Sequence, residues 1–233
     1  MSVIAVIPAR GGSKRIPRKN IKPFLGVPLL QRAVNCALES DVFSRVVVST
    51  DDVEIQRLSM SWGAEIPSLR PARLSDDYAG TSEVIAHVVS KLDCHEADEI
   101  CAIYATTPLM RSADLVQSLD RFRVEDCSFC FAVTSFEFPV QRAMHVRNGK
   151  CFPMYPAYER SRSQDLVEAF HDAGCFYWGS AKDWREQRSL YDGHAIPFFL
   201  PRYRVQDIDT EEDWERAELM FRVLNNDECP NKG

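Results

Sequence analysis

The 233-residue sequence has no apolar run near the length of about 20 residues that a membrane-spanning helix requires. It also lacks a signal-peptide pattern, because Met1 and Ser2 lead directly into a short apolar segment and then into charged residues. An excess of positive charge is absent as well, since the formal net charge is −6. We therefore expect a cytoplasmic protein with no membrane partner and no general affinity for nucleic acid.

Regular cysteine spacing is also missing, although the chain has eight cysteines. Several lie within apolar runs, which in a chain of this length favours buried free thiols over a disulfide framework. Cys127 and Cys130 form a CxxC pair in a predicted strand, where residues three apart point to opposite faces. No second CxxC accompanies the pair, so core cysteines are expected here rather than a metal site.

Neither standard glycine-rich phosphate motif occurs, since GxxxxGK[ST] and GxGxxG are both absent. A different pattern follows the apolar residues 3–8: six cations lie between Arg10 and Lys22, next to the pair Gly11-Gly12. Glycines let the backbone approach a ligand with its N–H groups turned inward, and neighbouring cations add charge-assisted hydrogen bonds. This pattern favours a polyphosphate site, with a solvated basic loop as the alternative.

Strand-like and helix-like segments alternate along the first 134 residues. Strands are predicted at 3–8, 45–49, 64–67, 99–105 and 128–134, and helices at 29–39, 52–62, 82–92 and after Ser112. This order predicts an α/β fold with a doubly wound, mostly parallel sheet. Ligands bind beyond the carboxyl ends of the strands in such sheets, which is where the basic segment lies.

The alternation ends after residue 135. Asn148-Gly149 lies between two strand-like segments and predicts a hairpin, so we expect residues 135–165, approximately, to leave the sheet as an arm. Strands resume at 174–178 and 194–201. We expect one domain over residues 1–224 and a disordered tail at 225–233.

Two carboxylates precede the last predicted helix, which begins with a capping box of Thr210 and Asp213. Asp207 and Asp209 alternate on an extended segment, so both point the same way while Ile208 points to the core. Paired carboxylates beside a polyphosphate suit Mg²⁺. On spacing alone, an aspartate that merely precedes the capped helix is an equal alternative.

Residues 7–20, IPARGGSKRIPRKN, closely resemble the nucleotide-binding signature of the cytidylyltransferases that activate sialic acid-like sugars, a family with CMP-N-acetylneuraminate synthetases and KDO cytidylyltransferases. The similarity extends from residue 3 to about residue 224, with further matches at 49–52, 70–71, 74–76, 106–109 and 207–213. Within the family, the stretches 138–142, 162–165, 171–174 and 200–204 resemble the branch that acts on pseudaminic acid.

The resemblance implies a Rossmann-like nucleotidyltransferase fold whose protruding arm pairs two subunits into a homodimer. It implies transfer of CMP from CTP to the C2 hydroxyl of pseudaminic acid, with release of pyrophosphate and Mg²⁺ as cofactor. Such a product serves bacteria that glycosylate flagellin or surface polysaccharide. N-acetylneuraminate, legionaminate and KDO remain alternative acceptors, and a non-catalytic nucleotide-binding protein is an alternative of another class.

The same resemblance assigns residues to each part of the reaction. Arg10, Lys14 and Lys19 are implied to be catalytic, through binding and neutralising the triphosphate. The nucleotide-binding set is Ala9, Arg10, Gly11, Gly12, Ser13, Lys14, Lys19, Asn20, Arg70, Gly80 and Thr81. Asn20 would hold the nucleotide or orient the loop. The acceptor-binding set is Arg162, Gln164, His171 and Asp172. Arg162 would grip the acceptor carboxylate, and His171 would be a polar contact or a base. Asp207 and Asp209 would hold the metal.

Overall fold

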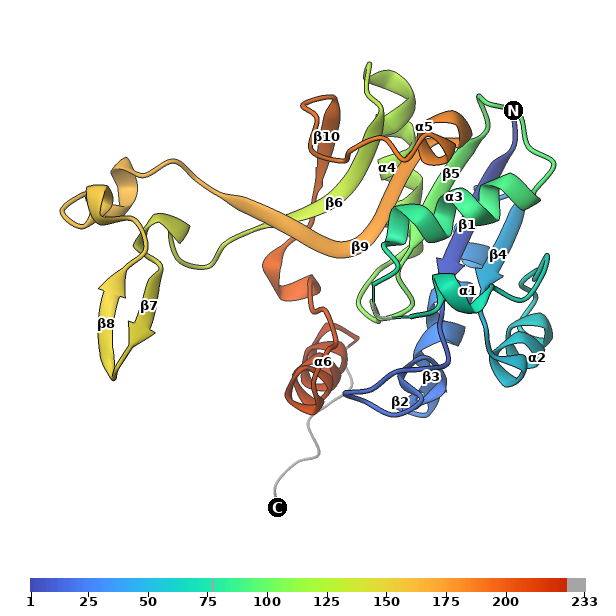
Figure 1. Cartoon of the computed structure of the whole chain (residues 1–233), viewed down its shortest axis with the longest axis horizontal. Coiled ribbons are helices and arrows are strands. Elements are labelled where there is room, and N and C mark those ends of the chain that lie inside the picture. The colour runs from blue at the N-terminus through green and yellow to red at the C-terminus, as the bar shows by residue number, and fades with distance from the viewer. Residues whose placement is uncertain (77, 226–233) are drawn as a thin grey trace.

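A six-stranded sheet forms the centre of the computed structural model, which describes residues 1–76 and 78–225 (Figure 1). The strand order is β10-β6-β9-β5-β1-β4. The strands are β1 (Val3–Pro8), β4 (Arg45–Ser49), β5 (Glu99–Ile103), β6 (Phe129–Ser135), β9 (Phe170–Ser180) and β10 (Ala195–Phe199). All pairings are parallel except those of β9, which runs antiparallel to β5 and β6. The prediction of a doubly wound, mostly parallel sheet is confirmed.

Helices cover both faces of this sheet, because the strands are largely apolar and their successive residues point to opposite sides. The helices are α1 (Leu29–Glu39), α2 (Val53–Ser61), α3 (Thr81–Lys91), α4 (Ser112–Val124), α5 (Ala181–Arg185) and α6 (Glu211–Leu224). Ala5 and Ile7 of β1 pack in one core with residues of α1, α2 and α4. Ile4 and Val6 pack in a second core with residues of α3 and α5.

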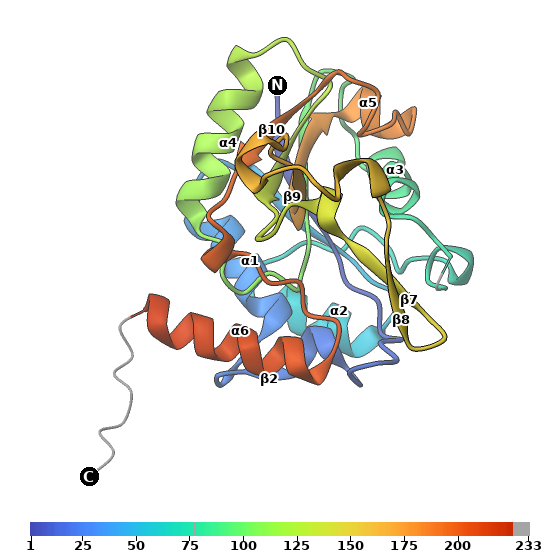
Figure 2. The ribbon, with the colours of Figure 1, turned by 90° about the vertical axis from the view of Figure 1, so that its left-hand side faces the viewer.

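The last helix, α6, packs against the segment that follows the basic loop. Phe24 and Trp214 meet edge to face, with ring centroids 5.6 Å apart, in a separate apolar cluster that also contains Ile208. Figure 2 shows α6 lying alongside the short strand β2 (Pro23–Phe24). The predicted capping box of Thr210 and Asp213 is present at the start of α6. This packing brings residues 207–209 next to the basic loop.

Three short elements differ from the prediction. The expected strand at 64–67 is reduced to a single bridge between Val47 and Glu65, because the chain only crosses the sheet edge there after α2 ends. Helix α5 and the hairpin of β2 with β3 (Val27–Pro28) were not expected. All three elements are too short for the periodicity of apolar residues to identify them.

Between β6 and β9 the chain leaves the sheet as an arm, defined here as residues 136–169 (Figure 1). Its hairpin pairs β7 (Met144–Arg147) with β8 (Lys150–Pro153). Asn148 and Gly149 form the turn with φ of 50° and 72°, the left-handed conformation that a two-residue hairpin requires. Every residue of both hairpin strands is exposed.

Other expectations concern features of the whole chain. The seven cysteines in the described residues are all free, and both Cys101 and Cys130 are buried. Among the described residues, no helix has the length and apolar character to cross a membrane. The tail expected at 225–233 lies, apart from Asn225, outside the described part of the chain.

Candidate active site at the carboxyl edge of the sheet

The basic loop, residues 9–20, begins at the carboxyl end of β1. Its first residue is anchored to the neighbouring strand, because the Ala9 N–H donates to the Ser49 carbonyl at 2.9 Å. Asn20 is buried and donates from Nδ2 to the Arg10 carbonyl at 2.9 Å. This bond closes the loop on itself. Of the two roles expected for Asn20, the contact fits the one that orients the loop.

The sequence suggested that Gly11 turns its backbone N–H toward a ligand, but in the structure this N–H is bound within the protein. Its N–H donates to Asp51 Oδ1 at 2.9 Å, so it is not turned toward a ligand. A Cβ at this position would lie 2.7 Å from Asp52 Oδ2, which is too close for any side chain. The glycine is therefore needed for close packing of the loop against the start of α2. At Gly12, by contrast, an added Cβ would meet nothing within 4 Å.

Arg18 ties the same loop to α2. Its guanidinium bonds to Asp52 and to Glu54, the latter at 2.5 Å. Asp52 also caps α2, accepting from the backbone N–H groups of Glu54 and Ile55. The hydrogen bond from Arg18 is the largest of the effects that hold the pKa of Asp52 below its ordinary value.

A pocket of about 320 Å³, called here the loop pocket, opens beside the basic loop. Eight of the residues predicted from the sequence line it: Arg10, Ser13, Lys14, Lys19, Asn20, Arg70, Thr81 and Asp209. Ala9, Gly11, Gly12 and Gly80 are not among its lining residues. Ala9 and Gly11 hold the loop in place, and Gly80 is the residue before α3.

Arg70 is the most deeply buried cation of the loop pocket, with 4% of its side chain exposed. Its Nε and Nη2 have no hydrogen-bond partner among the described residues, since Asp51 lies 3.8 Å away. Burial lowers the pKa of Arg70. A buried guanidinium with unsatisfied donors is costly unless an anion or a carbonyl oxygen meets it, so this pocket is suited to a ligand that carries such groups.

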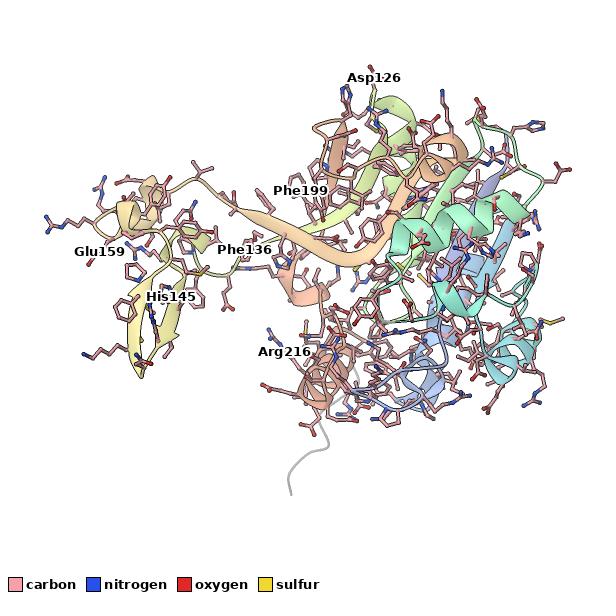
Figure 3. All side chains as sticks on the ribbon, in the orientation of Figure 1. Asp126, Phe136, His145, Glu159, Phe199 and Arg216 are labelled. Atoms are coloured by element: carbon pink, nitrogen blue, oxygen red, sulfur yellow. The ribbon has the colours of Figure 1, made fainter. Side chains whose placement is uncertain are left out.

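A second pocket of about 590 Å³, called here the acceptor pocket, lies next to the first. His171, Asp172 and Asp207 line it, as do several residues that the sequence did not predict: Tyr104, Glu137, Tyr177, Arg202, Gln206 and Arg216. Figure 3 labels Arg216, whose side chain extends from α6 toward the side of the molecule that carries the arm.

Asp172 is held firmly at the edge of the acceptor pocket. Tyr177 donates its hydroxyl to the Asp172 carboxylate, with 2.8 Å to each oxygen, and the Gly174 N–H donates at 2.8 Å. His171 Nδ1 lies 2.8 Å from the Asp172 carbonyl, so it donates there and leaves Nε2 as an acceptor when the ring is neutral. The pair therefore offers two fixed acceptors to a ligand with hydroxyl or amide hydrogens.

Tyr104 forms a wall shared by both pockets. Its hydroxyl lies 2.7 Å from Thr81 Oγ1, and its ring centroid is 5.3 Å from that of Tyr177. Burial raises the pKa of both tyrosines, so the hydroxyls stay protonated at neutral pH. Tyr104 directly follows β5, and its place at a strand's carboxyl end is a signal that could have identified it.

The two aspartates near α6 were expected to point the same way; they line two different pockets, which adjoin each other. Ile208 is fully buried between them, Asp209 lines the loop pocket and Asp207 lines the acceptor pocket. Desolvation, followed by the charge of Asp209, raises the pKa of Asp207. Lys19 Nζ donates to the Ile208 carbonyl at 2.5 Å and lies 3.3 Å from Asp209 Oδ1.

Arg162 and Gln164 do not join either pocket within one chain. They lie at the short 3₁₀ turn Ser163–Asp165 of the arm, where Arg162 pairs with Asp165 at 2.8 Å. Glu159, close to them in the sequence, is labelled at the outer end of the arm in Figure 3. Within one chain, the arm therefore carries Arg162 and Gln164 away from the pocket that His171 and Asp172 line.

A mostly parallel α/β sheet with a cation-lined pocket and an adjoining polar pocket at its carboxyl edge is typical of nucleotidyltransferases. A family model described as cytidylyltransferase matches residues 4–146. The chain is 42% identical to the pseudaminic acid cytidylyltransferase of Campylobacter jejuni, over 96% of this chain and 97% of the relative. It is 35% identical to the N-acylneuraminate cytidylyltransferase B of Danio rerio, over 94% of this chain and 51% of the relative. The chain belongs to the cytidylyltransferase family.

The fold is also similar to that of solved enzymes. A structure of CMP:2-keto-3-deoxy-manno-octonic acid synthetase in complex with CTP superposes with a TM-score of 0.73, at 17% identity, over 96% of this chain and 100% of that one. A 4-diphosphocytidyl-2C-methyl-D-erythritol synthase superposes with a TM-score of 0.64, at 13% identity, over 94% of this chain and 98% of that one. At these identities the likeness concerns the fold alone.

Proposed function

We propose that this chain transfers CMP from CTP to the C2 hydroxyl of pseudaminic acid and releases pyrophosphate, in a Mg²⁺-dependent reaction. The observation that carries the proposal is the shared wall at Tyr104, which places an acceptor pocket directly beside a cationic pocket. The 42% identity to a relative of that name, over nearly the full length of both chains, supports the choice of acceptor.

CTP would occupy the loop pocket. Charge builds on the oxygens of the α-phosphate and on the bridging oxygen as pyrophosphate leaves, so the site needs fixed cations more than covalent help. Arg10, Lys14 and Lys19 supply that charge from one loop. Arg70 adds a buried guanidinium from outside that loop.

Asp207 and Asp209 are suited to a Mg²⁺ ion, because both offer hard oxygen ligands and their mutual repulsion is relieved by a cation. No group of three or more potential ligands lies together in the described residues, so phosphate oxygens and water would complete the coordination. When bound, the ion supplies positive charge beside the reacting phosphate. Lys19, which bonds to the backbone between the two aspartates, orients this segment.

The acceptor would lie against Asp172 and His171. Asp172 accepts from a hydroxyl or amide of the sugar, since Tyr177 and Gly174 already fix its carboxylate. Arg202 and Arg216 supply cations for the carboxylate of a 2-keto sugar acid within the same chain. Tyr104 lines both pockets, so an acceptor hydroxyl beside it would lie close to a nucleotide held in the loop pocket.

We further propose that the arm pairs two copies of the chain. Its exposed apolar side chains include Phe138 at 74%, Met144 at 65% and Val146 at 71%. Surfaces of this kind mark protein contacts in soluble proteins. The predicted role of Arg162 and Gln164 in acceptor binding depends on this dimer, because neither residue lines the acceptor pocket of its own chain. The reaction is placed in the cytoplasm, where its donor CTP is found.

The test is pyrophosphate release from CTP and Mg²⁺ with a panel of pseudaminic acid, N-acetylneuraminate, legionaminate and KDO. We expect release with pseudaminic acid, and mass spectrometry should identify CMP-pseudaminic acid as the product. Release with N-acetylneuraminate alone contradicts the assigned acceptor. Binding of CTP without release for any sugar would instead favour a non-catalytic nucleotide-binding protein.

A further inference from the structure

Asp209 is already engaged by two cations. Arg15 Nη2 lies 2.9 Å from Asp209 Oδ1, and Lys19 Nζ lies 3.3 Å from the same oxygen. Arg15 was not among the residues implied by the sequence signature, yet it lines the loop pocket together with Arg10 and Lys14. The carboxylate proposed as a metal ligand is therefore paired with Arg15, a cation to which the proposed reaction assigns no role.

The two cations differ in how firmly they are held. Lys19 has a second bond, to the Ile208 carbonyl at 2.5 Å, and 18% of its side chain is exposed. Arg15 is 66% exposed, and Asp209 is its sole ion-pair partner among the described residues. An exposed pair of this kind is weak and is broken readily. Arg15 is thus the cation that can leave Asp209.

We propose that Arg15 is a positioning residue that competes with a divalent cation for Asp209 and passes to the triphosphate when the metal and CTP enter together. The inference rests on the proposed function, since it takes Asp209 as a metal ligand. The charge of Arg15 then opposes metal binding in the free protein and favours nucleotide binding in the complex. Without nucleotide, Arg15 keeps a metal ion off Asp209. With nucleotide, the released guanidinium can grip phosphate oxygens with two donors.

The experiment compares Arg15→Gln with Lys22→Gln. Lys22 carries the same charge on the same segment but pairs with Glu211 at 2.8 Å, so its variant controls for a general change in potential. Binding of Mn²⁺ without nucleotide is measured by electron paramagnetic resonance of the free ion. Binding of CTP with Mg²⁺ is measured by calorimetry, and thermal unfolding checks that each variant is folded.

We expect Arg15→Gln to bind Mn²⁺ about two- to fivefold more tightly than the wild type without nucleotide, as loss of a weak ion pair allows. The same variant should bind CTP with Mg²⁺ about fivefold more weakly, as loss of a charge-assisted contact implies. In an Asp209→Asn background the effect on Mn²⁺ should vanish. A gain in Mn²⁺ affinity equal to that of Lys22→Gln, or unchanged CTP affinity, overturns the inference.

Failure of the proposed function would look different. In that case the wild type itself would bind CTP with no dependence on Mg²⁺, and Asp209→Asn alone would leave Mn²⁺ binding unchanged. If the wild type and Asp209→Asn behave as a metal site requires while Arg15→Gln does not show opposite effects, only the role of Arg15 is wrong.

Discussion

At the scale of single residues, the loop pocket concentrates charges that have different tasks. Lys19 faces the pocket and bonds to the segment of Ile208 and Asp209. Lys22 lies only three residues later, pairs with Glu211 and does not line either pocket. Two lysines of one basic segment are thus expected to contribute very differently to turnover.

Lys19→Ala should lower kcat by about a hundredfold or more, because it removes a fixed cation from the reacting phosphates. Lys22→Ala is the matched control and should change kcat by less than about twofold, since its ion pair with Glu211 and its contact with the Trp214 ring both lie outside the two pockets. Steady-state rates of pyrophosphate release measure both, and circular dichroism verifies the fold. Wild-type turnover in Lys19→Ala would remove this residue from the site.

At the scale of elements, the basic loop depends on the start of α2 for its shape. Gly11 packs against Asp52, Asp51 accepts from the Gly11 N–H, and Arg18 bonds to Asp52 from the other side. The loop is therefore preformed by an element of the fold. Preformed geometry of this kind lowers the entropy lost when a ligand binds.

Gly11→Ala and Gly12→Ala form a matched pair that tests this packing. The first should lower the free energy of unfolding by about 1–3 kcal/mol, because its Cβ would overlap the Asp52 side chain. The second should change stability by less than about 0.5 kcal/mol, because its Cβ would point into open space. Urea unfolding followed by tryptophan fluorescence measures the difference. Equal stabilities would show that the loop is not pressed against α2.

The lowered pKa of Asp52 makes the free energy of unfolding depend on pH. Because the folded state lowers that pKa, the carboxylate stabilises the fold above the unfolded-state pKa, and this contribution is lost as pH falls through the folded-state value. Asp52→Asn keeps a capping oxygen but loses the charge. The variant should be up to about 1 kcal/mol less stable at pH 7, a modest figure because Arg18 is 38% exposed and solvent screens the pair.

The measurement is urea unfolding of the wild type and Asp52→Asn at pH values from 7 down to 2. The wild type should lose stability more steeply below about pH 4, the ordinary range for an aspartate, until the two curves meet. Curves that stay parallel over the whole range would mean that the Arg18 bond does not stabilise the folded state.

At the scale of the whole molecule, the arm extends from a compact part that carries the loop pocket and, apart from Glu137 at the base of the arm, the lining of the acceptor pocket (Figure 1). A hairpin whose strand residues are all exposed has little stability of its own, because isolated two-stranded hairpins are marginally stable in water. Pairing with a second copy would bury the apolar side chains of this hairpin.

Light scattering should therefore give twice the mass of one chain, and Val146→Asp should weaken the dimer at least tenfold, as a buried unpaired charge implies. Val124→Asp at the end of α4 is the control, since Val124 is 84% exposed and lies outside the arm. It should leave the mass unchanged. A monomeric wild type at micromolar concentration would refute the arm as a dimer contact.

Much of the architecture followed from local pattern. The apolar strands, the helix from Leu29 to Glu39, the cap at Asp52, the Asn148-Gly149 turn and the Thr210–Asp213 capping box are set by residues close in the chain. Their physics is short-range, so the sequence alone determined them. The basic signature also identified several of the residues that line the loop pocket.

The tertiary structure decided which distant residues meet. Packing of α6 on Phe24 places Asp209 beside Lys19, 190 residues earlier in the chain. Because β9 runs antiparallel to β5, Tyr177 lies against Tyr104, the residue that lines both pockets. No sequence motif predicts this contact. The arm carries Arg162 away from the acceptor pocket, while Arg202 and Arg216 line it. Periodicity shows which face of an element is buried, but contacts between elements depend on how the faces pack together.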